Sequence, residues 1–297
     1  MGSIRVNPYQ TPDLLASLDQ LKQQQDTATI ELATGSRINR PSDDPAGAAQ
    51  LSQLSDISSQ ADSFQKSIAS LTNQLSTADA TFSSLVTVLQ RAISLGVQGG
   101  NGTLSDSDRA AIAVELTSIQ SEVLNLANTS YQGHFIFAGT ATVQPFVLDP
   151  LSSSGVSYKG NVGTNKVSIG QGYQLQVNLA GSQIFNGAGA DVFQSIQDLI
   201  TSLNTNTGIP AAVTEVGTAF SYVTGQRVFY GNALNQTQTQ QTYLATQNLG
   251  LAQQQNAVGA ADIATVASQL VADQTARTAT LDAIGRVPQT SLFDFLK

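Results

Sequence analysis

Two adjacent carboxylates, Asp43 and Asp44, are the first candidates for chemistry in this sequence. They lie in the stretch R-I-N-R-P-S-D-D-P-A-G-A-A, which covers residues 37–49 and also contains Arg37 and Arg40. Paired carboxylates can share a proton in acid–base catalysis, and with further ligands they can bind a divalent cation. Either role needs partners, and this stretch supplies neither a histidine nor a further acid.

A structural role explains both carboxylates without catalysis. Proline disfavours helical backbone in the residue before it, so we expect an extended conformation at Asp44. An N-cap residue needs that conformation, and proline is favoured as the first residue of a helix. Both aspartates also place negative charge at the positive end of the helix dipole. We therefore predict a helix cap formed by Asp43, Asp44 and Pro45.

Few other residues could do chemistry. The chain has no cysteine, which excludes disulfides, thiolate nucleophiles and cysteine-based zinc sites. Its one histidine, His134, lies in Y-Q-G-H-F-I-F-A-G-T (131–140), and a single histidine is more often a polar surface group than a catalyst. The common motifs of serine hydrolases, zinc proteases and nucleotide-binding loops are absent. We expect no enzyme activity, no metal and no cofactor.

The composition also restricts the class of protein. The 297 residues carry a formal net charge of −8, which disfavours binding to nucleic acid through its phosphates. No apolar run approaches the roughly 18–20 residues of a membrane span. The first 30 residues lack the apolar segment of a signal peptide. We expect no nucleic-acid binding, no membrane insertion and, if the protein leaves the cell, a route without a cleaved leader.

Helices with heptad spacing must position these residues. One seam alternates steps of four and three for five heptads, which is the 3.5-residue repeat of a coiled-coil surface. Its members are Ile57, Ala61, Phe64, Ile68, Leu71, Leu75, Ala78, Phe82, Leu85, Leu89 and Ala92. It predicts a helix from about Pro45 to about Gly96, roughly 75 Å long at 1.5 Å per residue. A shorter seam predicts an earlier helix that ends near Gly35, and its members are Leu14, Leu18, Leu21, Gln25, Ala28 and Leu32.

Further helices are predicted after the long one. A loop at 99–106, with an N-cap at Ser105 or Asp106, precedes a third helix. Helical spacing returns around 193–203, from about Ala211 onwards, and again at Ile263, Ala267, Leu270, Gln274, Arg277, Leu281 and Ile284. Residues 228–261 contain no charged side chain. Disorder and burial in an assembly are the alternatives for this polar tract, and the persistent repeat favours burial.

The middle of the chain changes to a two-residue period. Tyr173, Leu175, Val177 and Leu179 alternate with polar residues, and Phe135-Ile136-Phe137 predicts another strand. We therefore predict a mainly α fold. It is an elongated antiparallel coiled-coil rod of long helices built from both ends of the chain, with a small β-rich domain inserted in the middle.

Both ends of the chain need partners. The first predicted helix has a narrow seam that includes Gln25, and a short helix is marginal without tertiary packing. The last residues, S-L-F-D-F-L-K, have nothing local to cover their apolar side chains, which favours docking on a partner; a membrane-surface helix would normally be basic. The subunit-interface candidates are Leu14, Leu18, Leu21, Arg37, Arg40, Leu270, Leu281, Ile284, Leu292, Phe293, Phe295 and Leu296.

These motifs resemble the bacterial flagellin superfamily. L-A-T-G-S-R-I-N-R-P-S-D-D-P-A-G-A-A (32–49) is similar to the family's N-terminal signature, although A-T-G-S replaces the more usual S-T-G-K. Its R-P-S-D-D-P variant resembles the hook–filament junction proteins more than filament flagellins, as does the turn at 131–140. Residues 263–281 and the end S-L-F-D-F-L look like the family's C-terminal helix. The resemblance covers the whole chain and is weakest at 141–190.

The resemblance implies a structural protein, exported unfolded through the flagellar type III apparatus and placed outside the cell at the hook–filament junction. It implies an inner terminal-helix domain (1–44 plus 257–297), a helical rod domain (45–138 plus 190–256) and an outer β domain (139–189). The implied partners are further copies in a ring or helical layer, hook-associated protein 1, flagellin and a cytoplasmic export chaperone. Filament flagellin is the alternative function, and a secreted coiled-coil adhesin or effector is a further one.

Overall fold

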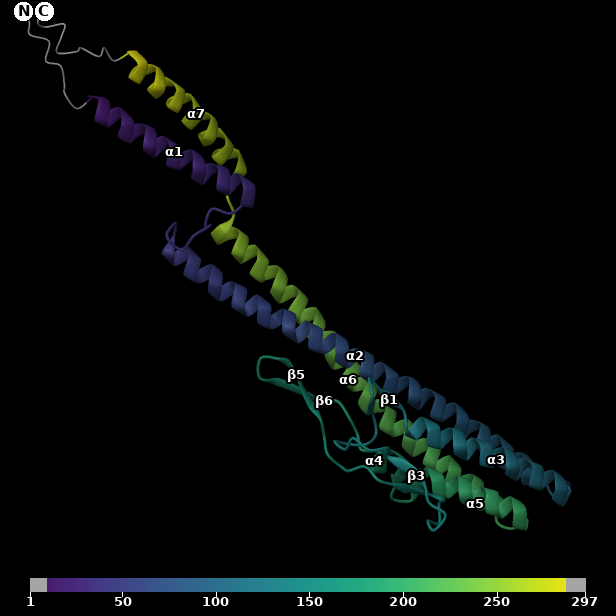
Figure 1. The fold of residues 1–297 in the computed structure, drawn as a ribbon. Coiled ribbons are helices and arrows are strands. Elements are labelled where there is room, and N and C mark those ends of the chain that lie inside the picture. Colours follow the sequence, from purple (N-terminus) through teal and green to yellow (C-terminus); the bar gives the residue numbers. More distant parts are fainter. Residues whose placement is uncertain (1–9, 287–297) are drawn as a thin grey trace, which may run out of the picture. The chain divides into compact units, whose positions relative to one another are not determined.

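The computed structural model describes residues 10–286, and this part of the chain is mainly helical (Figure 1). It divides into two compact units, residues 10–59 with 248–286 and residues 60–247. The helices are α1 (Gln10–Thr34), α2 (Pro45–Gly99), α3 (Asp106–Ala127), α4 (Gly181–Phe185), α5 (Val192–Thr205), α6 (Ile209–Gly259) and α7 (Ile263–Arg286). The prediction of a mainly α fold, in which long helices pack together around a small strand-containing insert, is confirmed. The three predicted domain boundaries stay predictions.

Local sequence signals set the helix ends. Gly35 adopts φ +67° immediately after α1, a conformation that suits glycine, and its N–H donates to the carbonyl of Glu31 at 2.8 Å. Ser105 caps α3 through a capping box, because its hydroxyl accepts from the N–H of Asp108 and its own N–H donates to the Asp108 carboxylate. The prediction of a helix end near Gly35 is confirmed, and of the two predicted N-cap positions, Ser105 and Asp106, the structure has Ser105.

The heptad seam of α2 forms the core of the second unit. Nine of its eleven predicted members are buried, and Ile57 and Phe64 are half-buried. They pack with apolar residues of α3, α5 and α6, and Figure 1 shows α2 and α6 side by side in this unit. Phe82 of α2 meets Tyr230 of α6 with ring centroids 5.1 Å apart. The uncharged tract after 228 lies in the continuous helix α6, so the alternative of disorder is wrong.

The insert is built from short hairpins. Its strands are β1 (Ser130–Tyr131), β2 (His134–Phe135), β3 (Phe146–Leu148), β4 (Val156–Tyr158), β5 (Lys166–Gly170), β6 (Tyr173–Gln176), β7 (Asn186–Gly187) and β8 (Ala190–Asp191). They form four antiparallel pairs of consecutive strands, with Phe146 opposite Tyr158 in the second. Phe146 and Phe185 pack at a centroid distance of 5.1 Å and anchor the insert's aromatic core.

Two strand predictions were too long. The strand predicted at 135–137 ends at Phe135. The N–H of Ile136 still donates to Thr129 beside the β1–β2 pair, but the carbonyl of Phe137 accepts from Gly181, which lies outside this hairpin. The alternating stretch from Tyr173 to Leu179 is a strand only as far as Gln176. The short helix α4 gave no periodic signal in the sequence, since it has only five residues.

The first unit contains the antiparallel pair α1 and α7. All six seam positions predicted on α1 are at least half-buried. On α7 the predicted seam is only partly right. Val266, Leu270, Asp273 and Ile284 are the less exposed positions, whereas Ile263 and Leu281 are each 48% exposed. Apolar residues lie on more than one side of α7, so heptad spacing alone does not identify the side that contacts α1.

One stretch of α2 is long and apolar enough to cross a membrane by composition alone, contrary to the expectation from the sequence that none would be. Its apolar side chains account for this property, because they form the core face of the second unit. A buried core helix meets the same length and hydropathy criteria as a membrane span.

Candidate assembly interface

A joint of main-chain hydrogen bonds connects the two chain segments of the first unit. Ser36 and Ala260 form an antiparallel β-bridge. The N–H of Arg37 donates to the carbonyl of Gly259 at 2.7 Å, and the N–H of Ala261 donates to the carbonyl of Gly35 at 2.9 Å. These bonds hold the start of α7 against the end of α1, so the terminal helices enter their pair from a fixed point.

Arg37 and Asp44 complete this joint. The Arg37 guanidinium donates to Oδ2 of Asp44 and to the carbonyl of Val258, each at 3.0 Å. Oδ1 of Asp44 accepts the N–H of Gly47 at 2.9 Å, as an N-cap carboxylate does. The hydrogen bond from Gly47, and then the one from Arg37, lowers the pKa of Asp44.

Asp43 accepts hydrogen bonds from other main-chain groups of the same turn. Its Oδ2 accepts the N–H groups of Asn39 at 3.0 Å and Arg40 at 2.8 Å. Each aspartate of the opening pair is therefore engaged by main-chain donors. Within residues 10–286, no group of three or more His, Cys, Asp or Glu side chains is placed to hold a metal ion. The arrangement can brace a turn and start a helix.

Arg40 differs from Arg37 because its guanidinium has no acidic partner in the described residues. The residue is exposed and makes no salt bridge within the part of the chain that the structure describes. It lines a cleft of about 330 Å³ beside Asp26 and Asp43. Of the two arginines proposed to pair with acids, Arg37 has its acid in the same chain, and the role of Arg40 stays a prediction.

The interface candidates on the terminal helices are divided between covered and uncovered positions. Leu14, Leu18 and Leu21 on α1 are half-buried, as are Leu270 and Ile284 on α7. Leu281 points outward, and Leu15 and Val271 are exposed apolar residues that the candidate set omitted. Leu292, Phe293, Phe295 and Leu296 lie outside the described residues. Two paired helices with apolar side chains still uncovered form a surface that suits a further partner.

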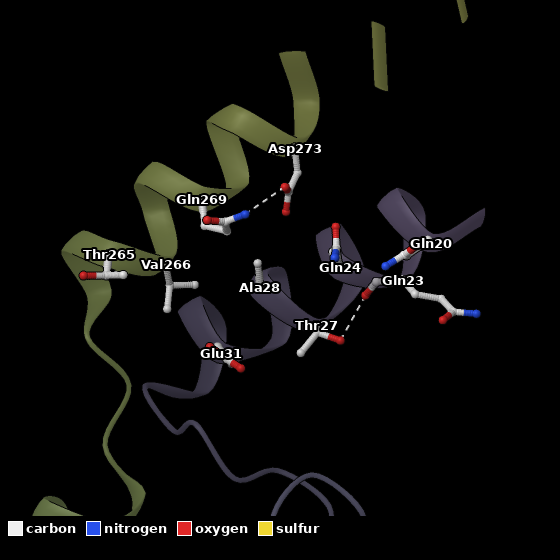
Figure 2. A pocket seen from close by; sticks show the side chains of 10 residues that line it. All are labelled: Gln20, Gln23, Gln24, Thr27, Ala28, Glu31, Thr265, Val266, Gln269 and Asp273. Carbon is white, nitrogen blue, oxygen red and sulfur yellow. Dashed lines mark hydrogen bonds between the residues drawn. The ribbon is translucent and has the colours of Figure 1, made fainter. Parts of the chain in front are cut away.

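A groove of about 580 Å³ lies between α1 and α7, and Figure 2 shows the side chains that line it. Asp273 lies in this groove with only 5% of its surface exposed. Oδ1 of Asp273 accepts from the Gln269 amide at 3.1 Å, whereas Oδ2 has no hydrogen-bond partner within residues 10–286. The buried Gln25 accepts from Arg277 at 3.1 Å, and its Nε2 has no partner among the same residues. The sequence marked Gln25 as a seam residue but gave no signal for Asp273, because the predicted seam of the last helix ran through its neighbour Gln274.

His134 lies apart from this interface. It is exposed on β2 and lines a cleft of about 320 Å³ in the insert, with Tyr131 and Asn178 among its neighbours. The side chain of Asn178 is bonded to main-chain groups. Its Oδ1 accepts the N–H of Asn165 at 2.6 Å, and its Nδ2 donates to the carbonyl of Gly163 at 3.1 Å. The residues that line this cleft include no Asp, Glu, Lys or second His.

Comparison with known proteins gives a consistent set of relatives. Residues 9–142 match the family described as bacterial flagellin N-terminal helical region. The flagellar hook-associated protein 3 of Salmonella typhimurium is 33% identical over 157 residues, which are 52% of this chain and 48% of that protein, so this match spans about half of the relative's length. The protein of the same name from Escherichia coli is 26% identical over 293 residues, covering 90% of this chain and 91% of that protein.

Flagellins match over shorter ranges than the Escherichia coli protein, and a solved structure shares the fold. A flagellin from Listeria monocytogenes is 36% identical over 116 residues, which are 39% of this chain and 40% of that protein. The structure of a putative flagellar hook-associated protein from Vibrio parahaemolyticus covers 73% of this chain and 99% of its own, with a TM-score of 0.68 and 23% sequence identity.

Proposed function

We propose that the chain is a member of the flagellin superfamily and a structural subunit of the bacterial flagellum that joins the hook to the filament and templates flagellin assembly. One observation carries this proposal. The alignment with the hook-associated protein 3 of Escherichia coli extends over 90% of the chain, whereas the alignments with flagellins of Listeria monocytogenes and Vibrio parahaemolyticus cover 39% and 62%. A filament subunit is therefore the weaker alternative.

The geometry of the first unit supports an assembling role. The α1–α7 pair leaves apolar residues uncovered, including Leu15, Val271 and Leu281. The joint fixes the end of α1 and the start of α7, because main-chain bonds tie Arg37 to Gly259 and Gly35 to Ala261. A surface that is completed only by neighbours, on helices held at one fixed end, is what a layered assembly of identical subunits requires.

The proposed partners follow from this role. Further copies of the chain form the ring or helical layer, hook-associated protein 1 lies on the hook side and flagellin on the filament side. A cytoplasmic export chaperone holds the C-terminal region before export. The chain contains no cysteine, so no disulfide would hinder passage of the unfolded polypeptide through a narrow channel. The proposed location is the extracellular hook–filament junction.

The test is where a tagged protein lies on the flagellum. A small epitope can be inserted at Leu151, which is 98% exposed in a turn of the insert. Electron microscopy with a gold-labelled antibody should show one band at the distal end of the hook. Label along the whole filament would instead identify a flagellin. A strain that lacks the gene should make few or no filaments while it secretes intact flagellin into the medium.

Removal of residues 257–297 gives a second test. This deletion takes away α7 and leaves α1 without its helix partner. We expect the truncated chain to keep the helical core of the second unit but to be absent from the hook tip. Circular dichroism reports the helices, and the same epitope reports the location. Normal placement of the truncated chain at the hook tip would contradict the role proposed for the terminal pair.

A further inference from the structure

A buried carboxylate oxygen without a partner lies in the groove between α1 and α7 (Figure 2). Only one oxygen of Asp273 has a hydrogen bond within residues 10–286, and that bond comes from Gln269 on the same helix. A buried carboxylate is costly unless a cation or several donors compensate its charge. The isolated chain therefore leaves Asp273 incompletely satisfied.

The groove itself offers Asp273 no cation. Its walls carry amide and hydroxyl side chains, small apolar groups and one further acid, Glu31. Arg277 lies one turn along α7, but it donates to Gln25 and makes no ion pair with Asp273 in the described chain. A cation that completes this site has to come from elsewhere.

Arg40 is the best-suited cation that this chain supplies. Its guanidinium has no salt bridge in the described residues, and its main chain is fixed, since Asp43 accepts from its N–H and donates to its carbonyl. Lys22 on α1 is another cation of this unit that makes no salt bridge in the described residues. A guanidinium is more weakly hydrated than an ammonium and matches a carboxylate with two parallel donors, so it suits a buried pair better.

We propose that Arg40 of one copy of the chain enters the α1–α7 groove of the next copy and pairs with Asp273. The proposal rests on the proposed function, because it needs neighbouring copies in a lattice. The contact joins two different surfaces, and such heterologous contacts produce closed rings or helical arrays. Oδ2 of Asp273 is buried in the described chain, so side chains that line the groove have to move when Arg40 enters.

This pairing gives the buried acid a purpose in assembly. In the free chain the unpaired oxygen weakens the α1–α7 pair, and in the lattice the same oxygen receives a charge-assisted bond. The energetic gain is therefore realised only between copies. A neighbour whose surface lacks a cation at this place leaves Asp273 unsatisfied, so the pair also selects for the correct neighbour.

The absence of native cysteine allows a direct test between copies. Arg40→Cys and Asp273→Cys are placed in separate, distinguishably tagged copies and expressed together in the flagellated bacterium, in place of the native gene. Intact flagella are then treated with a short bismaleimide. We expect a covalent dimer that carries both tags and that forms only when both variants are present. The matched pairs Lys22→Cys with Asp273→Cys, and Arg40→Cys with Asp282→Cys, should give little or none.

Charge reversal tests the pairing by function. Asp273→Arg and Arg40→Glu should each reduce incorporation into flagella at least about tenfold, as expected when one partner of a buried ion pair is reversed. The double variant should recover most of the loss. Asp282→Arg, at an exposed position of the same helix, should incorporate normally. The amount of each variant secreted into the medium shows that it is stable and exported.

Two results overturn the proposal. The first is the absence of the mixed dimer while the tagged native chain lies at the hook tip, which leaves the proposed function intact. The second is that Arg277→Gln lowers incorporation as much as Asp273→Asn while Arg40→Glu does not, which means that Asp273 is completed within one chain. Failure of the proposed function is seen separately, as label along the filament or none on the flagellum.

Discussion

The buried phenol oxygen of Tyr230 accepts the main-chain N–H of Leu179 at 3.2 Å. Leu179 belongs to the insert between β6 and α4, and Tyr230 lies within α6 with its ring against Phe82 of α2. One side chain thus connects the insert to both long helices of the second unit. Burial raises the pKa of the Tyr230 phenol well above its ordinary value, because the ionised form would lose its hydration.

Removal of this hydroxyl should weaken the second unit. Tyr230→Phe keeps the ring contacts but leaves the N–H of Leu179 buried without an acceptor, which costs about 1–3 kcal/mol. Urea unfolding followed by circular dichroism measures the change. Tyr243→Phe is the matched control, since Tyr243 is 60% exposed on the same helix, and its effect should stay within about 0.5 kcal/mol. Equal midpoints for the two variants would contradict the role of the Leu179 contact.

The same phenol predicts an alkaline loss of stability. A tyrosine whose folded pKa is raised contributes stability that is fully present below the unfolded pKa of about 10 and is lost as pH rises above it. The urea midpoint of the native chain should therefore fall between about pH 9.5 and 11. Tyr230→Phe should fall less steeply over that range, and Tyr243→Phe should follow the native chain. Parallel curves for all three would argue that Tyr230 ionises freely in the folded state.

Asp79 predicts a loss of stability at acidic pH, as Tyr230 does at alkaline pH. Arg227 of α6 donates Nε and Nη2 to the two oxygens of this α2 carboxylate, at 2.7 and 2.9 Å, and the hydrogen bond lowers the pKa of Asp79. A depressed carboxyl pKa contributes stability that is present above the unfolded value of about 3.9 and is lost as pH falls through the folded value. Stability should therefore fall on acidification below about pH 4.

Asp79→Asn should remove this acidic loss, together with the stabilisation at neutral pH. Glu115→Gln is the matched control, because the Arg91–Glu115 pair is more exposed and surface pairs contribute little. Urea midpoints at pH 7, 4 and 3 measure both variants. A native-like acid slope in Asp79→Asn would show that other carboxylates account for it.

The joint predicts a local effect of Asp44. Asp44→Ala removes the acceptor of the Gly47 N–H and the partner of Arg37, whereas Asp44→Asn keeps a side-chain acceptor for the cap. Amide hydrogen exchange at Gly47 should therefore accelerate in the alanine variant and change much less in the asparagine variant. If both variants exchange alike, the ion pair with Arg37 rather than the cap protects this amide.

Much of the helical framework could be predicted because one physical rule determines it. A seam from Ile68 to Ala92 is buried on one side only, so its apolar residues repeat with the helix, and Gly35 and Ser105 mark helix ends by their backbone requirements. The flagellin-like stretch at 32–49 could also be identified, because it lies in one continuous segment.

The remaining features depend on contacts that a single sequence does not encode locally. The side of α7 that contacts α1 is set by packing, and Asp273 lies on it among polar residues that resemble an exposed face in the sequence. The strand from Tyr173 ends at Gln176, and beyond it the main chain bonds to other elements, as the N–H of Leu179 does to Tyr230. Arg40 and Asp273 are 233 positions apart, and their proposed pairing requires a second copy.

Two glycines predict opposite effects of the same substitution. Gly225 is exposed within α6 and a Cβ there meets nothing within 4 Å, so Gly225→Ala should stabilise the helix by about 0.5–1 kcal/mol through the entropy of the unfolded chain. Gly35 is equally uncrowded, but its φ of +67° is strained for any residue with a Cβ, so Gly35→Ala should cost roughly 1–2 kcal/mol. Urea midpoints compare the two variants with the native chain, and hydrogen exchange of Arg37 and Ala261 shows whether the joint loosens with Gly35→Ala. Stabilisation by both substitutions would mean that the turn after α1 can leave its left-handed conformation without loss of the joint.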